Sequence, residues 1–181
     1  VSPLFSNTGS VDVASGALNL YGGGTSTGSF IAESGTTLQF SDGTYILSSG
    51  SSVTGTGNVA VTGGTIDING TYNITGGTNV AGGTIRFNPA STLTRLGDAL
   101  TITGGTIDLS SGEAVNVATL NLSNGTLTGS DIVTVNGTFN WTSGWMSGTG
   151  ATNIPAGRTL NLATVSYPYL DGRTLNNSGT A

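Results

Sequence analysis

The chain has 181 residues, and Gly, Thr, Ser and Asn together make up more than half of them. It contains no His, Cys or Lys, and nine acidic residues against four arginines give a net charge of −5. These features exclude a disulfide framework, a thiolate nucleophile, a Ser-His-Asp triad and a Cys/His zinc site, and they disfavour nucleic acid as a partner. No apolar segment approaches the roughly 18 residues of a membrane-spanning helix, and we expect no metal or cofactor.

Short apolar segments alternate with turn residues along the whole chain. Apolar residues recur at every second position within each segment, between turns rich in Gly, Thr, Asn and Ser. Alternation with a period of two is typical of short β-strands. A hydrophobic content of 35% opposes disorder, since disordered chains are poor in apolar residues. The sequence therefore predicts an all-β protein.

The apolar segments repeat with a period of about 20 residues, in the range typical of solenoids. They fall into three columns, which we name leading, middle and trailing by their order within a repeat. The leading column contains Val11 and Val13, Phe30, Val53, Tyr72 and Ile74, Leu93, Val115 and Val117, Val133 and Val135, and Ile154. The middle column contains residues 18–20, 38–40, 59–61, 78–80, 100–102, 120–122, 139–141 and 160–162. The trailing column follows a glycine turn and contains Ile46, Ile66, Ile85, Ile107, Leu127 and Met146.

Three short strands in each repeat indicate one coil of a parallel β-helix, also called a β-solenoid. A β-sandwich is disfavoured because its strands are longer and its loops vary more in length. About eight coils at a spacing of about 4.8 Å would form a rod roughly 40 Å long, with apolar columns inside and glycines at the corners.

The whole chain, residues 1–181, is expected to form a single solenoid domain with regular coils over about residues 11–165. An irregular C-terminal end is expected over 166–181, because Leu175 follows Leu160 by clearly less than one full repeat. The chain starts at Val1 without an initiator Met and stops within a repeat. We therefore expect it to belong to a longer repeat protein or assembly.

Three segments carry a resemblance to known proteins: Thr62–Ile68 (TGGTIDI), Thr103–Leu109 (TGGTIDL) and 137–162. They resemble β-helical passenger and stalk segments of large bacterial secreted proteins, namely autotransporter passengers and filamentous-haemagglutinin-like adhesins. The resemblance implies a right-handed parallel β-helix outside the cell or at its surface, and it carries over no catalytic residue.

The function predicted on this basis is that of a non-enzymatic structural segment, either an adhesin stalk or a self-assembling extracellular filament. One alternative is a carbohydrate-binding β-helix module. A polysaccharide-degrading enzyme of the pectate-lyase kind is disfavoured, because such enzymes use acid clusters with Lys or Arg on one face and this chain has no Lys.

Two polar ladders are predicted on the outside of the coils. The central residues of the middle column point outward, because neighbours on a strand face opposite sides. They form either a stabilising ladder of hydrogen-bonded side chains or a strip that binds sugars: Asn19, Gln39, Asn79, Thr101, Asn121, Asn140 and Asn161, interrupted by Ala60. In the trailing column, Asp67, Arg86 and Asp108 are expected to form a charge ladder of alternating sign, which we interpret as structural rather than catalytic.

Both tryptophans fall in one repeat, where Trp141 is expected in the core and Trp145 at a turn. An exposed Trp145 is the candidate ligand-binding residue, because an indole ring stacks well on a sugar ring. Neither end of the chain contains an amphipathic helix that would cap the stack. We therefore expect association end to end, or with flanking repeats of the same protein, and surface glycans as a further class of partner.

Overall fold

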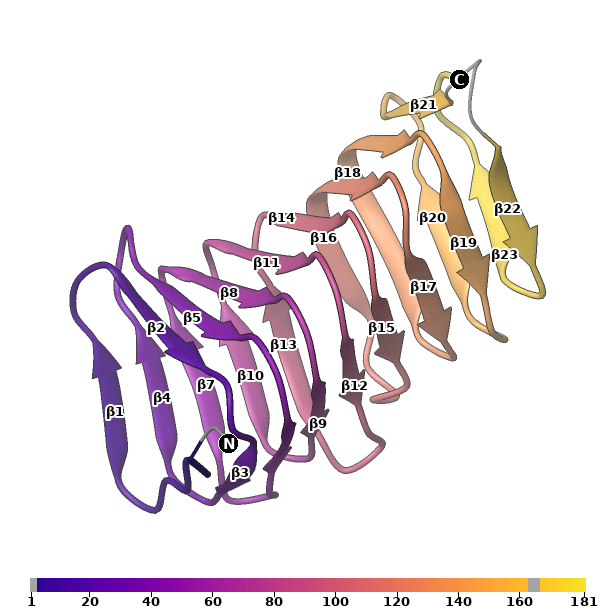
Figure 1. The fold of residues 1–181 in the computed structure, drawn as a ribbon. Coiled ribbons are helices and arrows are strands. Elements are labelled where there is room, and N and C mark those ends of the chain that lie inside the picture. Colours follow the sequence, from indigo (N-terminus) through magenta and orange to yellow (C-terminus); the bar gives the residue numbers. More distant parts are fainter. Residues whose placement is uncertain (1–2, 163–166) are drawn as a thin grey trace.

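Over the residues that the structure describes, 23 short strands wind into a stack of about eight coils (Figure 1). The computed structural model describes residues 3–162 and 167–181, and within these ranges each strand pairs in parallel with equivalent strands one coil away. The predicted all-β parallel β-helix is confirmed. Among the described residues there is no helix that is long and apolar enough to cross a membrane.

The strands form three sheets that run along the stack. The five-stranded sheet contains β1 (Ser10–Val13), β4 (Ser29–Ala32), β7 (Ser52–Gly55), β10 (Thr71–Ile74) and β13 (Thr92–Leu96). The ten-stranded sheet contains β2 (Ala17–Leu20), β5 (Thr37–Phe40), β8 (Asn58–Val61), β11 (Gly77–Val80), β14 (Ala99–Ile102), β16 (Val115–Leu122), β18 (Ile132–Trp141), β20 (Ala151–Ile154), β21 (Thr159–Leu162) and β23 (Thr174–Asn177). The eight-stranded sheet contains β3 (Gly24–Ser26), β6 (Thr44–Leu47), β9 (Thr65–Ile68), β12 (Thr84–Phe87), β15 (Thr106–Leu109), β17 (Thr126–Gly129), β19 (Gly144–Ser147) and β22 (Pro168–Asp171).

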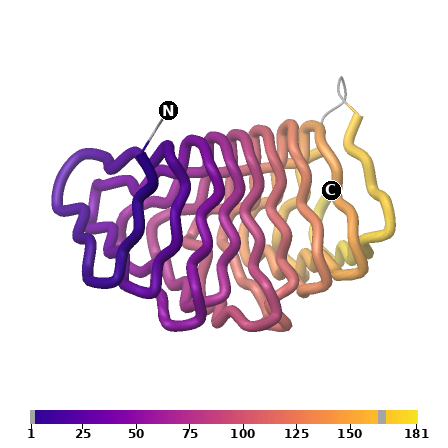
Figure 2. The backbone as a smooth tube through the Cα atoms, turned by 60° about the horizontal axis from the view of Figure 1, so that its bottom comes forward, coloured from indigo at the N-terminus to yellow at the C-terminus, as the bar shows by residue number. Residues whose placement is uncertain are grey.

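The middle column forms one row of in-register pairs from β2 to β21. Leu18 pairs with Leu38, Leu100 with Leu120, and Phe139 with Leu160. Apolar side chains of this column stack in the interior, where Leu38, Leu100 and Leu120 are fully buried. The backbone tube in Figure 2 shows the resulting coils side by side, with the first strands (indigo) at one end of the stack and the last strands (yellow) at the other.

The trailing column contains one error of assignment, at Ile46. In β6 it is Tyr45 that pairs with Ile66 and is buried, whereas Ile46 pairs with Asp67 and is 43% exposed. Inward and outward positions alternate along each strand, and their order is fixed by the distance from the corner glycine. Gly43-Thr44-Tyr45 matches Gly64-Thr65-Ile66 residue for residue, so Tyr45 is the inward residue. A tyrosine can replace isoleucine at this inward position because the aromatic ring is large and mostly apolar.

Leading and middle columns are separate strands in most coils but join into one continuous strand in β16 and in β18. Between β13 and β14 the chain turns a corner at Gly97, which has a φ of +103°. In β16 the strand instead runs through Ala118, with a local register shift between Val117 and Thr119. Neither Ala118 nor Gly137, which lies at the same corner of β18, has a positive φ, so both strands pass this corner without the turn that Gly97 makes.

The C-terminal end is more regular than the sequence suggested. Within the predicted irregular segment, whose residue 166 lies outside the described ranges, β22 pairs with β19 and β23 pairs with β20. Leu175 pairs with Thr152 and therefore belongs to the leading column, whereas Leu160 belongs to the middle column. Because the two leucines belong to different columns, their short separation along the sequence does not break the repeat. The stack therefore continues to the last strand of the chain.

Aromatic and polar groups complete the interior. Tyr72 contacts Phe87 edge to face, with ring centroids 5.0 Å apart. The hydroxyl of Tyr72 lies 2.7 Å from that of Thr78, which in turn donates to the Leu96 carbonyl at 2.6 Å. This pairing explains how a threonine can occupy an inward position of the middle column, since a buried hydroxyl is costly only when it lacks a partner. Burial raises the pKa of the Tyr72 phenol well above its ordinary value, against a smaller lowering by the Thr78 contact.

Candidate functional site

The outward residues of the middle column form a hydrogen-bonded ladder in the C-terminal half of the stack. Asn161 Nδ2 donates to Asn140 Oδ1 at 2.8 Å, and Asn140 Nδ2 donates to Asn121 Oδ1 at 2.8 Å. Asn121 Nδ2 continues the ladder to Thr101 Oγ1 at 3.2 Å. In this half the amide groups are occupied by one another, so their arrangement stabilises the stack.

The N-terminal half of the same row is different. Gln39 donates to the Ser41 hydroxyl at 2.8 Å within its own coil, and Ala60 interrupts the row in the next coil. Among the described residues, no side-chain hydrogen bond joins Asn19 or Asn79 to the ladder. The predicted ladder is therefore continuous from Thr101 to Asn161 only.

A shallow groove lies on the outer face of the ten-stranded sheet where the ladder is absent. It crosses β5, β8, β11 and β14, and its lining includes Gln39, Asn58, Ala60, Gly77, Asn79 and Ala99. Small residues form its floor, and amide side chains stand beside them. The described residues that line it include no charged side chain.

The predicted charge ladder is in register but only partly paired. Arg86 lies opposite Asp67 on one side and Asp108 on the other. Its Nη1 donates to Asp67 Oδ1 at 3.3 Å, while Asp108 instead accepts a hydrogen bond of 2.6 Å from the Ser110 hydroxyl. The Arg86 and Asp67 side chains are 45% and 29% exposed, so their pairing contributes about 0.2–1 kcal/mol at most.

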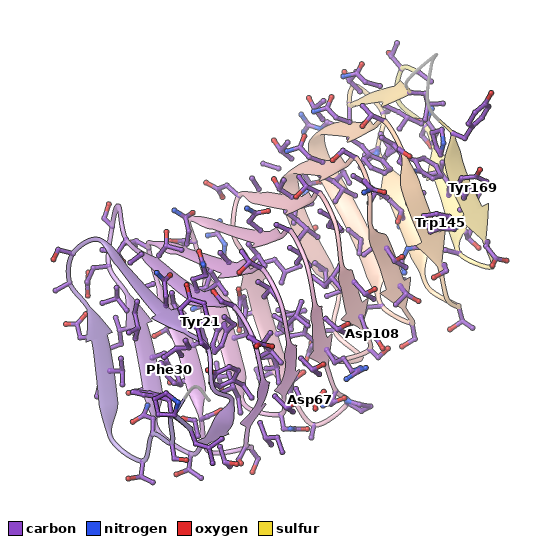
Figure 3. All side chains as sticks on the ribbon, viewed as in Figure 1. Tyr21, Phe30, Asp67, Asp108, Trp145 and Tyr169 are labelled. Atoms are coloured by element: carbon purple, nitrogen blue, oxygen red, sulfur yellow. The ribbon has the colours of Figure 1, made fainter. Side chains whose placement is uncertain are left out.

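Trp145 lies in a strand and stacks on a second aromatic ring, that of Tyr169. The residue points outward from β19 with 45% exposure, and its ring lies 5.0 Å from that of Tyr169 in β22 at an interplanar angle of 10° (Figure 3). The expected position at a turn is therefore wrong. Trp141, by contrast, is buried in the core and stacks on Phe139.

A buried arginine near the C-terminal end was not predicted. Arg173 is 2% exposed; its Nε donates to Thr152 Oγ1 at 2.9 Å, and its Nη2 donates to the carbonyls of Asp131 and Ala151 at 2.8 and 2.9 Å. Burial lowers the pKa of Arg173 to about 10, against the opposing attraction of Asp131, so the guanidinium stays charged at neutral pH.

The Asp131 carboxylate also binds the turn of the preceding coil. It accepts hydrogen bonds of 2.9 and 2.6 Å from the backbone N–H and hydroxyl of Ser111, and one of 2.8 Å from the N–H of Gly112. Asp131 and Arg173 thus connect the corners of successive coils. The two residues are separated by about two coils along the chain, and no local motif in the sequence marks the pair.

Both ends of the stack expose strand edges and apolar side chains. At the N-terminal end, Leu4 and Tyr21 are exposed and line a small apolar hollow together with Phe5 and Leu18. At the C-terminal end, Leu162 and Leu170 are 51% and 50% exposed, although equivalent residues in inner coils are buried. At each end the last strands have an edge whose backbone N–H and C=O groups face no further strand, and the apolar core is open to a neighbouring molecule or coil.

The fold and these surfaces define the class of the protein: it is a β-solenoid repeat protein with polar ladders on its outer faces. Comparison of the chain with protein-family models, with curated proteins and with solved structures gave no significant match. Within the described ranges there is no cluster of three or more acidic side chains, or of His and Cys, that could hold a metal ion.

Proposed function

We propose that this chain is a structural segment of a secreted bacterial surface protein, either an adhesin stalk or part of a self-assembling extracellular filament, and that it is not an enzyme. The observation that carries the proposal is the open stack of coils, in which parallel pairing runs from the first coil to the last (Figure 2). Each end exposes strand edges and apolar residues whose equivalents in inner coils are buried. In a solenoid each coil is stabilised by its neighbours, so an open end is best covered by another coil.

The coil sequences support the extracellular part of this proposal through their resemblance to autotransporter passengers and filamentous-haemagglutinin-like stalks. The resemblance is carried by Thr62–Ile68, Thr103–Leu109 and residues 137–162. The partner at each end is accordingly a like coil, supplied by a second copy or by further repeats of the same protein.

Light scattering and electron microscopy of the isolated chain at micromolar concentration test the proposal. We expect elongated end-to-end assemblies, and we expect Leu170→Lys to abolish them because a charge at the open core prevents stacking. Ile132→Lys is the matched control, since Ile132 is 49% exposed on the side of the stack and not at its end. A monodisperse monomer of the unaltered chain, or equal assembly of both variants, would contradict the proposal.

A second candidate function, carbohydrate binding, is favoured by the exposed pair of Trp145 and Tyr169. Aromatic rings at a surface bind sugar rings by stacking, although each ring of this pair has one face covered by the other. The test is a glycan array with the unaltered chain and with Trp145→Ala. Specific binding that is lost in the variant would support this function.

A further inference from the structure

The outer face of the ten-stranded sheet changes character at Thr101. From Thr101 to Asn161 the outward amides donate to one another along the ladder. In the groove region, the side chains of Asn58 and Asn79 are exposed, and among the described residues neither of them hydrogen-bonds to another protein group. Outward asparagine side chains of this sheet therefore have hydrogen-bond partners in the C-terminal half of the stack, whereas Asn58 and Asn79 are available to a ligand.

The shape of the groove follows from the register of four strands. Thr37, Asn58, Gly77 and Ala99 are consecutive partners in one outward row, and Gln39, Ala60, Asn79 and Thr101 are consecutive partners in the other. Ala60, Gly77 and Ala99 supply almost no side chain, so the surface is lowered between the amides. The side chain of Asn58 leans over this floor, since a Cβ atom at Gly77 would lie 3.3 Å from Asn58 Oδ1.

The chemistry of the lining selects the ligand. Each amide offers both a donor and an acceptor, as each sugar hydroxyl does, so the two kinds of group are complementary. The lining, as far as the structure describes it, is free of charged side chains, and the net charge of the chain is −5, which opposes an anionic ligand. The polar groups repeat at the strand spacing of about 4.8 Å, which suits a ligand with hydroxyl groups at regular intervals.

We propose that this groove binds a short, neutral, linear oligosaccharide that lies along the axis of the stack. The side chains of Gln39, Asn58 and Asn79 hydrogen-bond to its hydroxyl groups, and the sugar rings lie over Ala60, Gly77 and Ala99. This inference concerns the same activity as the second candidate function, carbohydrate binding, and assigns it to a groove on another sheet as the alternative to the Trp145–Tyr169 pair. It is independent of the structural role of the stack.

The test is binding of the intact chain to an array of neutral linear oligosaccharides of glucose, mannose, galactose, xylose and N-acetylglucosamine, with oligogalacturonate as an anionic probe. Titration calorimetry then measures the affinity of the best neutral probe for four variants. We expect Asn79→Ala to weaken binding about threefold to tenfold, the effect of one or two lost hydrogen bonds. Ala99→Gln, which fills the groove, should abolish binding.

Asn161→Ala is the control variant: it removes an amide of the same row outside the groove and should bind as the unaltered chain does. Trp145→Ala distinguishes the two candidate sugar sites, because binding persists in this variant if the groove is the site and is lost if the aromatic pair is the site. Circular dichroism verifies that every variant is folded, and Asn79→Ala remains informative if Ala99→Gln does not fold. The inference is overturned if no neutral probe binds, if oligogalacturonate binds more tightly, or if Asn79→Ala binds normally. Loss of binding in Trp145→Ala alone would move the site to the aromatic pair.

Discussion

Replacement of Arg173 by methionine should loosen the C-terminal coils more than any change of a surface charge. Methionine fills most of the space of the arginine side chain, so the change removes the guanidinium and leaves no large cavity. Four acceptors then lose a hydrogen bond from the guanidinium, namely the Thr152 hydroxyl and the carbonyls of Gly129, Asp131 and Ala151. The Asp131 carboxylate keeps its contacts to Ser111 and Gly112 but loses the electrostatic attraction of the guanidinium.

The size of the effect follows from these contacts. A hydrogen bond from a charged donor contributes about 1.5–3 kcal/mol, and the cost of burying the guanidinium offsets part of that sum. Removal of one partner from a buried charged network typically costs about 3–5 kcal/mol, and we expect Arg173→Met to fall in this range. Because coils are stabilised by their nearest neighbours, the loss should concentrate between β18 and β23.

Hydrogen exchange measured by mass spectrometry, together with urea denaturation, checks this prediction. Exchange should accelerate in residues 130–162 and 168–177 while the coils of β5 to β12 stay protected. Arg158→Met is the matched control: Arg158 is exposed, and the change should alter stability by no more than about 0.5 kcal/mol. The reasoning is refuted if Arg173→Met is as stable as the unaltered chain, or if exchange rises equally in all coils.

Three further predictions concern the interior and the ladder. Leu120→Asp places a charge in a fully buried position between Leu100 and Phe139, and far-ultraviolet circular dichroism on heating should show loss of the cooperative transition. Asn140→Ala removes two ladder hydrogen bonds and should lower the free energy of unfolding by about 1–2 kcal/mol in urea, whereas Asn79→Ala should change it by less than about 0.5 kcal/mol. The Tyr72 phenol has a raised pKa in the folded chain, so its contribution to stability is complete below the ordinary pKa of 10.0 and is lost as the pH rises above it. Urea denaturation between pH 8 and 11 should therefore show a decline that is smaller in Tyr72→Phe, and equal slopes would argue against it.

Periodicity in the sequence was sufficient to predict the coils, because equivalent strands stack on one another and place apolar residues at the same positions in nearly every repeat. The error at Ile46 arose from choosing the aliphatic residue of a Thr-Tyr-Ile-Leu strand instead of counting from the corner glycine. The count from Gly43 gives Tyr45 as the inward residue, so the necessary signal was present.

The contacts between distant corners could not be predicted in the same way. Arg173 and Asp131 lie in turns, whose lengths vary, and neither belongs to a repeating column. The stacking of Trp145 on Tyr169 depends on β22 remaining in register after a longer than usual step from Met146 to its partner Leu170. The interruption of the amide ladder at Ala60, by contrast, was visible in the sequence. The groove could not be predicted from it, because the groove also requires Gly77 and Ala99 in the neighbouring outward row of the sheet.

The nearly constant length of the coils also determines how the chain reaches this structure. Each strand pairs with one that lies a single coil away along the chain, so every added coil closes a loop of nearly the same size. The entropy of closing a loop rises slowly with its length, and here the cost is similar at each step. Folding can therefore start at the most stable coil and proceed by addition of neighbours in both directions. Whole coils could likewise be inserted or removed at a corner while the order of strands in the remaining stack stays the same.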